Sequence, residues 1–209
     1  MEPALTRLDA ADRPAGVVLM LHGGKARSSA VVDRRSASWR RSLAMQAAIA
    51  PALHEAGASV WLLRYRRRGW NAGADVTADA RWALDQVRAS VGDVPVVLLG
   101  HSMGARVAVR VADDPLVRGV VGLAPWWSPE DPVAALAGRR LLAAHGRRDR
   151  ITSFRATAAY VERARRVALG AELRDMGPLG HYMLAGAASW NQVAVASSLE
   201  VLVSETRAG

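Results

Sequence analysis

The sequence predicts an α/β protein in which helices cover both faces of an open, mostly parallel β-sheet. Short apolar runs alternate with longer helical stretches along the chain. The first five of six such runs are apolar almost throughout, as is typical of parallel strands that are buried on both faces. Glycine-containing segments follow four of the runs, and open α/β sheets bind ligands there, beyond the carboxyl ends of their strands.

The runs predicted as strands are residues 16–21, 58–63, 94–99, 117–124, 139–145 and 171–176. Helical stretches separate them, so parallel neighbours are expected to be joined by right-handed crossovers. Five helices are predicted, at residues 39–56, 76–91, 103–113, 153–168 and 187–205.

Local signals refine two of these helices. In the second, apolar residues between Val76 and Val87 fall on one stripe, and charged residues lie largely outside it. Asp75 or Thr77 is expected to cap the start of this helix. Pro51 is expected to kink the first helix or to end it early, because proline lacks the amide hydrogen that a helix interior uses.

A single domain spanning residues 1–209 fits this pattern. The chain has 209 residues, of which 51% are hydrophobic, and globular domains usually contain between about 50 and 250 residues. It contains no cysteine, which excludes disulfides, thiolate zinc sites and a cysteine nucleophile. The first apolar run, Val17 to Leu21, is too short for a signal peptide or a membrane span, so we expect a cytoplasmic protein.

The basic residues are numerous but scattered. The formal net charge is +9, and Lys25 is the only lysine. The arginine-rich segments 34–41, 64–68 and 146–150 are separate in the sequence, and no RNA-binding or helix-turn-helix pattern accompanies them. We therefore expect no specific nucleic-acid partner.

A serine between two glycines stands at a corner between two predicted elements. The segment Gly100-His101-Ser102-Met103-Gly104 joins the strand at 94–99 to the helix at 103–113. Glycine tolerates a strained or crowded backbone, so the segment predicts a turn too tight for larger side chains at its two glycines. Such a turn would hold the hydroxyl of Ser102 above the end of the strand.

Other strand ends carry side chains that suit acyl-transfer chemistry. The glycine-containing segment 22–25 follows the first strand, Asp149 follows the fifth and His181 follows the sixth. In this Ser, Asp, His order and in its glycine-flanked serine, the sequence resembles the α/β-hydrolase family. It is most similar to small members without a cap domain, of the serine esterase, lipase or dienelactone hydrolase kind. The resemblance extends from about residue 15 to about residue 205.

The resemblance implies a role for each of these residues. Ser102 would be the nucleophile, His181 the base that activates it, and Asp149 the carboxylate that orients the histidine. Backbone N–H groups of Met103 and of the 22–25 loop, most simply that of Gly24, would bind the oxyanion of the tetrahedral intermediate.

Other acidic residues compete with Asp149 for its role. Glu130 and Asp131 follow the preceding strand, where some members of the family place the acid, and Asp175 lies within the last strand. The segment 145–152, which contains Asp149, resembles the acid loop of the family more closely, and this favours Asp149.

The substrate side of the site is expected to be open. Only residues 125–138 separate the strand at 117–124 from the next one, which leaves no room for the helical cap of larger family members. Trp126, Trp127 and Tyr182 are candidates for contact with substrate. For the two tryptophans, the competing interpretation is that they fill the top of the core.

Two groups of arginines are also expected on this side of the sheet. The simpler interpretation is a solvated, arginine-rich surface, and the alternative is a rim that favours anionic substrates. These residues are Arg64, Arg66, Arg67, Arg68, Arg147, Arg148 and Arg150.

Together these features predict a serine hydrolase that cleaves carboxylic esters through an acyl-enzyme. A thioesterase or an acyltransferase would use the same residues and is the alternative. A non-catalytic, basic binding protein on a hydrolase scaffold is an alternative of a different class. The expected partner is a small-molecule ester or thioester. We expect no cofactor and no metal, because the sequence has neither a zinc-protease spacing of histidines nor a phosphate-binding glycine loop.

Overall fold

A single seven-stranded sheet forms the centre of the computed structural model, which describes residues 2–203. The strand order is β1-β3-β2-β4-β5-β6-β7. β1 runs antiparallel to β3, and all other neighbouring strands are parallel. The strands are β1 (Ala4–Leu8), β2 (Gly16–Leu21), β3 (Ala58–Arg64), β4 (Val96–His101), β5 (Val117–Leu123), β6 (Arg140–His145) and β7 (Gly170–Asp175).

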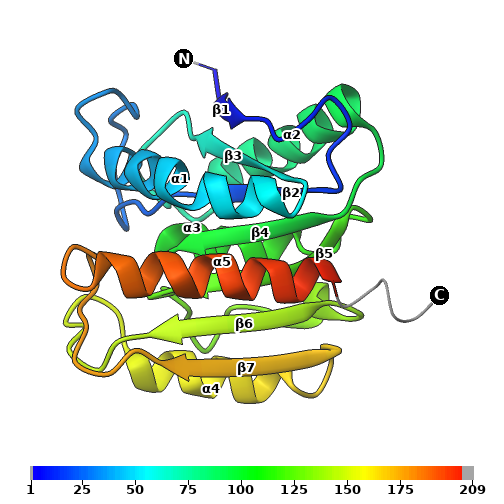
Figure 1. Ribbon diagram of the computed structural model, residues 1–209. Helices are drawn as coiled ribbons and strands as arrows, with labels where there is room; N and C mark the ends of the chain where they lie inside the picture. Colours follow the sequence, from blue (N-terminus) through cyan, green and yellow to red (C-terminus); the bar gives the residue numbers. More distant parts are fainter. Residues whose placement is uncertain (1, 204–209) are drawn as a thin grey trace.

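Helices cover both faces of this sheet. Figure 1 shows α1 (Ala37–Glu55) and α5 (Ala187–Val203) in front of it, and α2 (Ala74–Val91), α3 (Met103–Val111) and α4 (Phe154–Ala164) behind it. A short 3₁₀ helix, η1 (Ala134–Leu136), precedes β6. The fold class predicted from the sequence is therefore confirmed.

The core consists of one hydrophobic cluster on each face of the sheet. Val17 and Leu19 of β2 belong to the cluster under α2, α3 and α4, whereas Val18 and Met20 belong to the cluster under α1 and α5. All six residues of β2 are buried. Burial on alternate faces explains why the central strands are apolar throughout, because neither face meets water.

The elements predicted from the sequence are present with boundary shifts of a few residues, and one strand was missed. β1 is short and half-buried, and it lies at the edge of the sheet. Its sequence, ALTRL, contains too few apolar residues to stand out as a buried run. The last predicted helix agrees with α5 up to residue 203, and its residues 204–205 lie outside the described part of the chain.

The structure contradicts the early helix end expected at Pro51 and the cap expected for the second helix. Pro51 lies inside α1, which continues to Glu55. Pro51 and Ala47, whose carbonyl loses its helical partner, are both exposed, so water can bind that carbonyl. Neither Asp75 nor Thr77 caps α2: its N-cap is Gly73, in the left-handed conformation with φ of 95°.

The corner that carries Ser102 lies at the carboxyl edge of the sheet. β4 ends at His101 and α3 begins at Met103, so Ser102 alone makes the turn. A Cβ atom on Gly104 would collide with the backbone carbonyl of Leu21, and one on Gly100 would collide with the backbone of Ala105. The two glycines therefore allow α3 to start directly against the end of β2.

This close contact makes a prediction about stability. We expect Gly104→Ala to lower the free energy of unfolding by about 3 kcal/mol, because the new methyl group must displace backbone rather than a flexible side chain. Urea unfolding monitored by circular dichroism measures the change.

Gly170→Ala is the matched control. A Cβ atom there would lie 3.7 Å from the nearest atom, on the Arg140 guanidinium, so the change in unfolding free energy should stay within about 1 kcal/mol. Equal effects of the two substitutions would show that the contact at Gly104 does not constrain the fold.

Candidate active site

Ser102 is held in a strained backbone conformation. Its φ of 54° and ψ of −115° are sparsely populated by residues with a side chain, and such strain is concentrated at functional sites. The surrounding backbone fixes it: the Ser102 N–H donates to the carbonyl of Leu123 at 3.1 Å, and the Ser102 carbonyl accepts from the N–H groups of Ala105 and Trp126, both at 3.2 Å. The conformation is thus imposed by β5, α3 and the segment after β5.

Ser102, His181 and Asp149 form a continuous line of hydrogen bonds. His181 Nε2 lies 3.1 Å from Ser102 Oγ, and His181 Nδ1 lies 2.7 Å from Asp149 Oδ2. An ionised carboxylate only accepts hydrogen bonds, so Nδ1 is the protonated nitrogen of a neutral His181. Nε2 is then free to accept the proton of Ser102. Ser102 and His181 are each 6% exposed.

Two residues that the sequence analysis did not single out also bind the carboxylate of Asp149. His145 Nε2 lies 3.1 Å from Asp149 Oδ2, and Thr152 Oγ1 donates to the same oxygen at 2.8 Å. On its far side, His145 Nδ1 lies 2.7 Å from Thr157 Oγ1. The signal for both residues was in the segment 145–152 itself, because positions 145 and 152 flank the acid.

The surroundings of Asp149 favour its charged form. Burial alone would raise its pKa, but hydrogen bonds from His145 and His181, and from the amides of Thr152 and Ile151, hold the pKa of Asp149 well below its usual range. Its other oxygen, Oδ1, accepts from both amides at 2.8 Å. Asp149 is therefore a buried anion that faces two imidazole rings.

Two further histidines lie buried beside this line. His101 Nε2 donates to the carbonyl of His181 at 3.0 Å, and its ring lies 5.0 Å from that of His181. His22 Nδ1 donates to the carbonyl of Gly23 at 2.7 Å. Burial lowers the pKa of His101 to about 3, with the nearby His181 contributing, and burial lowers the pKa of His22 to about 4. Both rings are therefore neutral at pH 7.

The two residues expected to supply oxyanion donors are neighbours, because the side chain of Met103 packs against Gly24. Met103 is the first residue of α3, where the N–H has no acceptor within the helix. A Cβ atom on Gly24 would lie 2.5 Å from Met103 Sδ and from the Arg68 carbonyl, so only glycine fits beside Met103. The N–H of Lys25 donates to that Arg68 carbonyl at 2.8 Å. The N–H of Lys25 therefore already has an acceptor, and Gly24 is among the residues of this loop whose N–H groups have none in the described part of the chain.

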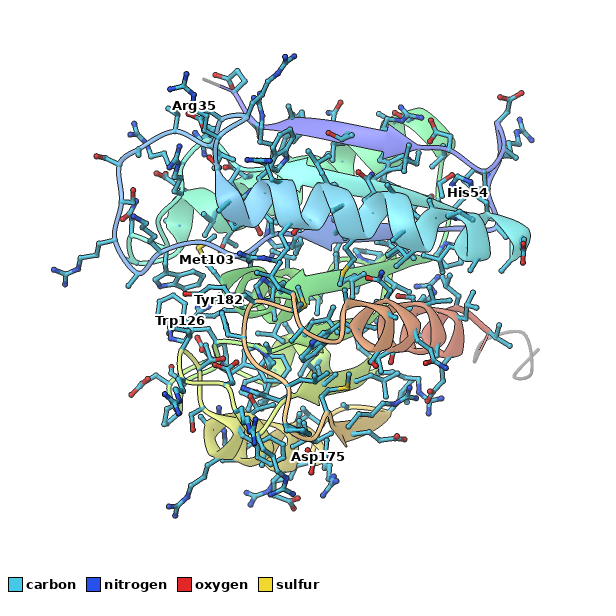
Figure 2. All side chains as sticks on the ribbon, turned by 60° about the vertical axis from the view of Figure 1, so that its left-hand side comes forward. Arg35, His54, Met103, Trp126, Asp175 and Tyr182 are labelled. Carbon is cyan, nitrogen blue, oxygen red and sulfur yellow. The ribbon has the colours of Figure 1, made fainter. Side chains whose placement is uncertain are left out.

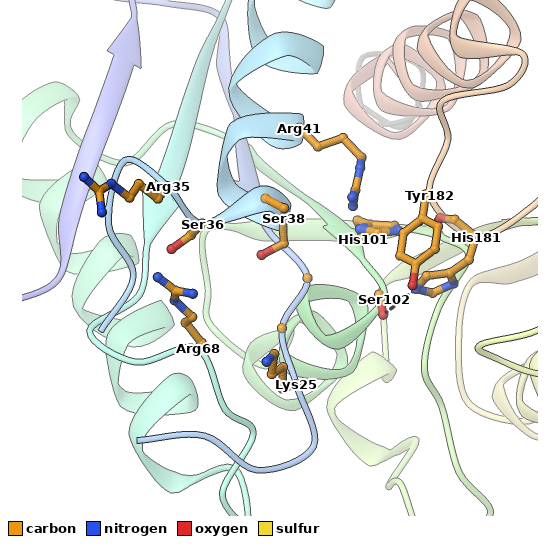
Figure 3. A pocket seen from close by; sticks show the side chains of 13 residues that line it. Lys25, Arg35, Ser36, Ser38, Arg41, Arg68, His101, Ser102, His181 and Tyr182 are labelled. Atoms are coloured by element: carbon orange, nitrogen blue, oxygen red, sulfur yellow. Dashed lines mark hydrogen bonds between the residues drawn. The ribbon is translucent and has the colours of Figure 1, made fainter. Parts of the chain in front are cut away.

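A cavity of about 340 Å³ opens beside Ser102. Figure 3 shows Ser102, His101, His181 and Tyr182 at one end of it. Its other lining residues come from the loops after β2 and β3 and from the start of α1, namely Gly23, Gly24, Lys25, Arg35, Ser36, Ala37, Ser38, Arg41 and Arg68. Tyr182 therefore lies where the sequence analysis expected it.

The two tryptophans do not line this cavity. Trp127 is 3% exposed, stacks on Tyr160 and donates from Nε1 to the carbonyl of Ala105 at 3.0 Å. It fills the top of the core, as the competing interpretation proposed. Trp126 is half-buried and packs against Trp70 and the Arg106 guanidinium. Figure 2 shows Trp126, Met103 and Tyr182 at the same edge of the molecule, with His54 on the far side.

The competing acids lie away from His181. Asp131 is buried in ion pairs with Arg106 and Arg110, and Asp175 pairs with Arg147. Of the seven arginines expected on a rim, only Arg68 lines the cavity. Among residues 2–203, no group of three His, Asp or Glu side chains is arranged to hold a metal ion, and no helix is long and apolar enough to cross a membrane.

Comparisons with known proteins agree with this architecture. Residues 18–205 match the model of the alpha/beta hydrolase family. No curated protein sequence matches the chain. A solved alpha/beta serine hydrolase without a lid from Xanthomonas campestris is similar in fold, with a TM-score of 0.62, 21% identity and 94% of each chain covered.

Two solved esterase structures are also similar to this chain in fold. The thermophilic esterase Est2 from Thermogutta terrifontis, bound to butyrate, has a TM-score of 0.69 and 18% identity, over 98% of this chain and 90% of that one. Est1E from Butyrivibrio proteoclasticus, bound to ferulic acid, has a TM-score of 0.70 and 11% identity, over 96% of both chains. At these identities the likeness concerns the fold.

The buried neutral histidines predict a loss of stability in acid. The pKa values of His22 and His101 in the folded chain lie below the value of 6.5 for an unperturbed histidine. Below about pH 6.5 the unfolded chain therefore binds protons that the folded chain excludes. The unfolding free energy should fall between pH 6.5 and 4.5 by up to about 1.4 kcal/mol per pH unit for each histidine.

Urea unfolding at pH 7.5, 6.5, 5.5 and 4.5 measures this slope. Asp149 does not contribute to it above about pH 5, because a carboxyl with a lowered pKa loses its stabilising effect only as the pH falls below its value of about 3.9 in the unfolded chain. Replacing His101 by Asn should reduce the slope. A stability that is constant from pH 7.5 to 4.5 would contradict the prediction.

Proposed function

Because the chain belongs to the alpha/beta hydrolase family, we propose that it is a serine hydrolase that cleaves carboxylic esters through an acyl-enzyme. The observation that carries this proposal is the hydrogen-bonded line from Ser102 Oγ through His181 to Asp149. It lies at the end of an open cavity of about 340 Å³, which gives a small ester access to Ser102.

The first half of the proposed reaction is acylation of Ser102. As Ser102 Oγ attacks the ester carbonyl, its proton passes to His181 Nε2. The imidazolium that forms is stabilised by the Asp149 carboxylate, 2.7 Å from Nδ1. The N–H groups of Met103 and Gly24 bind the oxyanion. His181 then gives its proton to the departing alkoxide, and the acyl group stays on Ser102.

The second half is hydrolysis of the acyl-enzyme. His181 Nε2 takes a proton from water as the water oxygen attacks the acyl carbonyl. The tetrahedral intermediate then collapses, the bond to Ser102 Oγ breaks, and His181 returns the proton to Oγ, which releases the acid and restores both residues. Only residues 124–139 separate β5 from β6, and η1 is the only helix they contain. Within residues 2–203, no helical cap therefore follows β5 over the cavity, and access of water favours hydrolysis over transfer to another acceptor.

The extra partners of Asp149 support its role as the orienting acid. Thr152 and His145 donate to the oxygen that accepts from His181. They keep this carboxylate ionised and fix its direction, so that it presents a full negative charge to His181 Nδ1. The adjacent His101 is neutral at pH 7, so it adds no positive charge that would oppose protonation of His181.

Labelling by a fluorophosphonate probe tests the proposal first. We expect mass spectrometry to locate one adduct on Ser102 of the wild-type protein. The adduct should be absent in Ser102→Ala and should form at least about 100-fold more slowly in His181→Ala, because a general base contributes about 10²–10⁴-fold to rate. The labelled enzyme should no longer hydrolyse 4-nitrophenyl butyrate.

Further measurements on the same protein distinguish an esterase from a thioesterase, an acyltransferase and a binding protein. Faster turnover of a butyryl thioester than of the oxygen ester would favour a thioesterase, and faster acyl transfer to an added alcohol than to water would favour an acyltransferase. An absence of any adduct on the folded wild-type protein would overturn the enzyme proposal in favour of a binding protein on a hydrolase scaffold.

Replacement of the acid gives an independent prediction. Asp149→Asn should lower kcat for 4-nitrophenyl butyrate by about 10⁴-fold, because asparagine no longer selects the tautomer of His181 that accepts a proton from Ser102. Asp175→Asn is the matched control, since Asp175 pairs with Arg147 away from the line, and it should retain kcat within about two-fold. A loss at Asp175 and not at Asp149 would assign the acid to the other residue.

A further inference from the structure

The cavity beside Ser102 is lined by four basic side chains and by no acidic one. Lys25 comes from the loop after β2, Arg68 from the loop after β3, Arg35 from the segment before α1, and Arg41 from α1. Figure 3 shows Arg41 near Ser102 and the imidazole of His101, with Arg35 and Arg68 at the opposite end and Lys25 between. The positive charge therefore surrounds the space that a substrate would occupy.

Several arginines outside the cavity are paired with carboxylates, which reduces their net charge. Such pairs are Arg66–Asp79, Arg81–Asp113, Arg88–Asp114, Arg106–Asp131, Arg110–Asp131, Arg147–Asp175, Arg165–Glu162 and Arg174–Glu200. Of the four cations that line the cavity, only Arg68 has a carboxylate partner within the described residues, namely Asp33.

One carboxylate stands behind the cavity, and it neutralises only Arg68. Asp33 Oδ1 accepts from Arg68 at 2.8 Å, from Ser36 Oγ at 2.9 Å and from the amide of Arg35 at 3.0 Å. Arg68 also donates from Nε to the carbonyl of Val31 at 2.8 Å. Arg68 is thus fixed and balanced. Within residues 2–203, the side chains of Lys25 and Arg35 form neither a hydrogen bond nor an ion pair.

Arg41 is the least compensated of the four. Its guanidinium lies 5.1 Å from the centre of the Tyr182 ring, and its Nε is buried without a hydrogen-bond partner in the described part of the chain. Burial lowers the pKa of Arg41, although it remains a cation. A partly buried cation without an acidic partner is unfavourable, and an anion in the cavity would remove this penalty.

The start of α1 adds to the positive potential. Ser36 is the N-cap, but its hydroxyl bonds to Asp33 and makes no capping hydrogen bond to the helix. The first turn contains no acidic residue, and its residues Ala37 and Ser38 line the cavity. The free N–H groups and the positive end of the helix dipole therefore lie beside Lys25 and Arg41, where they favour an anion.

We propose that the substrate carries an oxyanion, either a carboxylate or a phosphate, which binds among Lys25, Arg41 and the start of α1 while the ester bond lies at Ser102. This inference rests on the proposed function, because it names the substrate class of the same site. An oxyanion accepts several charge-assisted hydrogen bonds at once, so one such group satisfies both cations and the free amides.

Competition with fluorophosphonate labelling of Ser102 tests the inference. Adipate supplies carboxylates, pyrophosphate supplies phosphates, and adipamide is a neutral control of the same length as adipate. At low ionic strength, we expect one of the two anions to slow labelling at least about five-fold at millimolar concentration, and adipamide to have no effect. The protection should weaken in 0.5 M NaCl, which screens exposed charges. The anion that protects identifies the group.

Substitutions locate the site. Arg41→Gln and Lys25→Gln should each raise the protecting concentration about ten-fold, the usual effect of removing a charged hydrogen-bond donor. Arg40→Gln and Arg27→Gln are matched controls, because these neighbours do not line the cavity, and they should leave protection unchanged. If adipate is the anion that protects, kcat/KM should be about ten-fold higher for mono-4-nitrophenyl adipate than for 4-nitrophenyl hexanoate, and Arg41→Gln should remove this preference.

The result that overturns the inference is distinct from failure of the proposed function. Labelling of Ser102 that neither anion slows would reject the oxyanion site and leave the hydrolase proposal intact. If Ser102 is not labelled at all, the hydrolase proposal fails, and calorimetric titration with adipate and pyrophosphate then decides the anion site alone. Binding lost in Arg41→Gln but kept in Arg40→Gln would support the site, and no heat with either anion would reject it.

Discussion

The start of α3 lies against the end of β2 with no space for a side chain between them. This contact, at Gly104 and the carbonyl of Leu21, fixes how the loop after β2 lies relative to the corner at Ser102. Because of it, Gly24 reaches Met103 and the first N–H of α3 stands next to that loop. The position of Ser102 relative to the loop after β2 therefore depends on a backbone-to-backbone packing constraint.

The second determinant of the site is the distribution of charged and neutral side chains around His181. One buried carboxylate, Asp149, receives every hydrogen bond it can use, and so it stays negative. The buried rings of His22 and His101 stay neutral. In contrast, four basic side chains line the cavity. Negative charge thus lies behind His181 and positive charge lies where substrate would bind. This separation suits a reaction that creates an imidazolium and an oxyanion at the same time.

Much of the site could be predicted from the sequence because the carboxyl ends of parallel strands meet at one edge. Ser102, Asp149 and His181 each follow a recognisable strand, so their order along the chain was sufficient to bring them together. Local patterns do not fix the conformation of loops. The cationic wall depends on how residues 25–41 fold back over the sheet, and only the structure shows that Lys25, Arg41 and Arg68 share one cavity.

Predictions from the sequence were least accurate where the burial of a residue depends on neighbours that are distant along the chain. Trp127 follows a strand end and looked equally suited to a pocket or a core, and its stacking on Tyr160 of α4 decides for the core. The sequence analysis did not single out His145, and only the structure shows that its Nε2 lies 3.1 Å from Asp149 Oδ2. β1 has no buried face of its own, and its pairing with β3 alone defines it as a strand.

The conformation of Ser102 lowers the stability of the fold for as long as a residue with a side chain occupies this corner. Its φ of 54° is one that glycine adopts freely, and strain of this kind amounts to about 1–3 kcal/mol. A chain selected only for resistance to heat would therefore tend to place glycine at this corner and lose the hydroxyl. If Ser102 is the nucleophile, as proposed, stability and activity are opposed at position 102, and efforts to stabilise the protein should be directed to other parts of the chain.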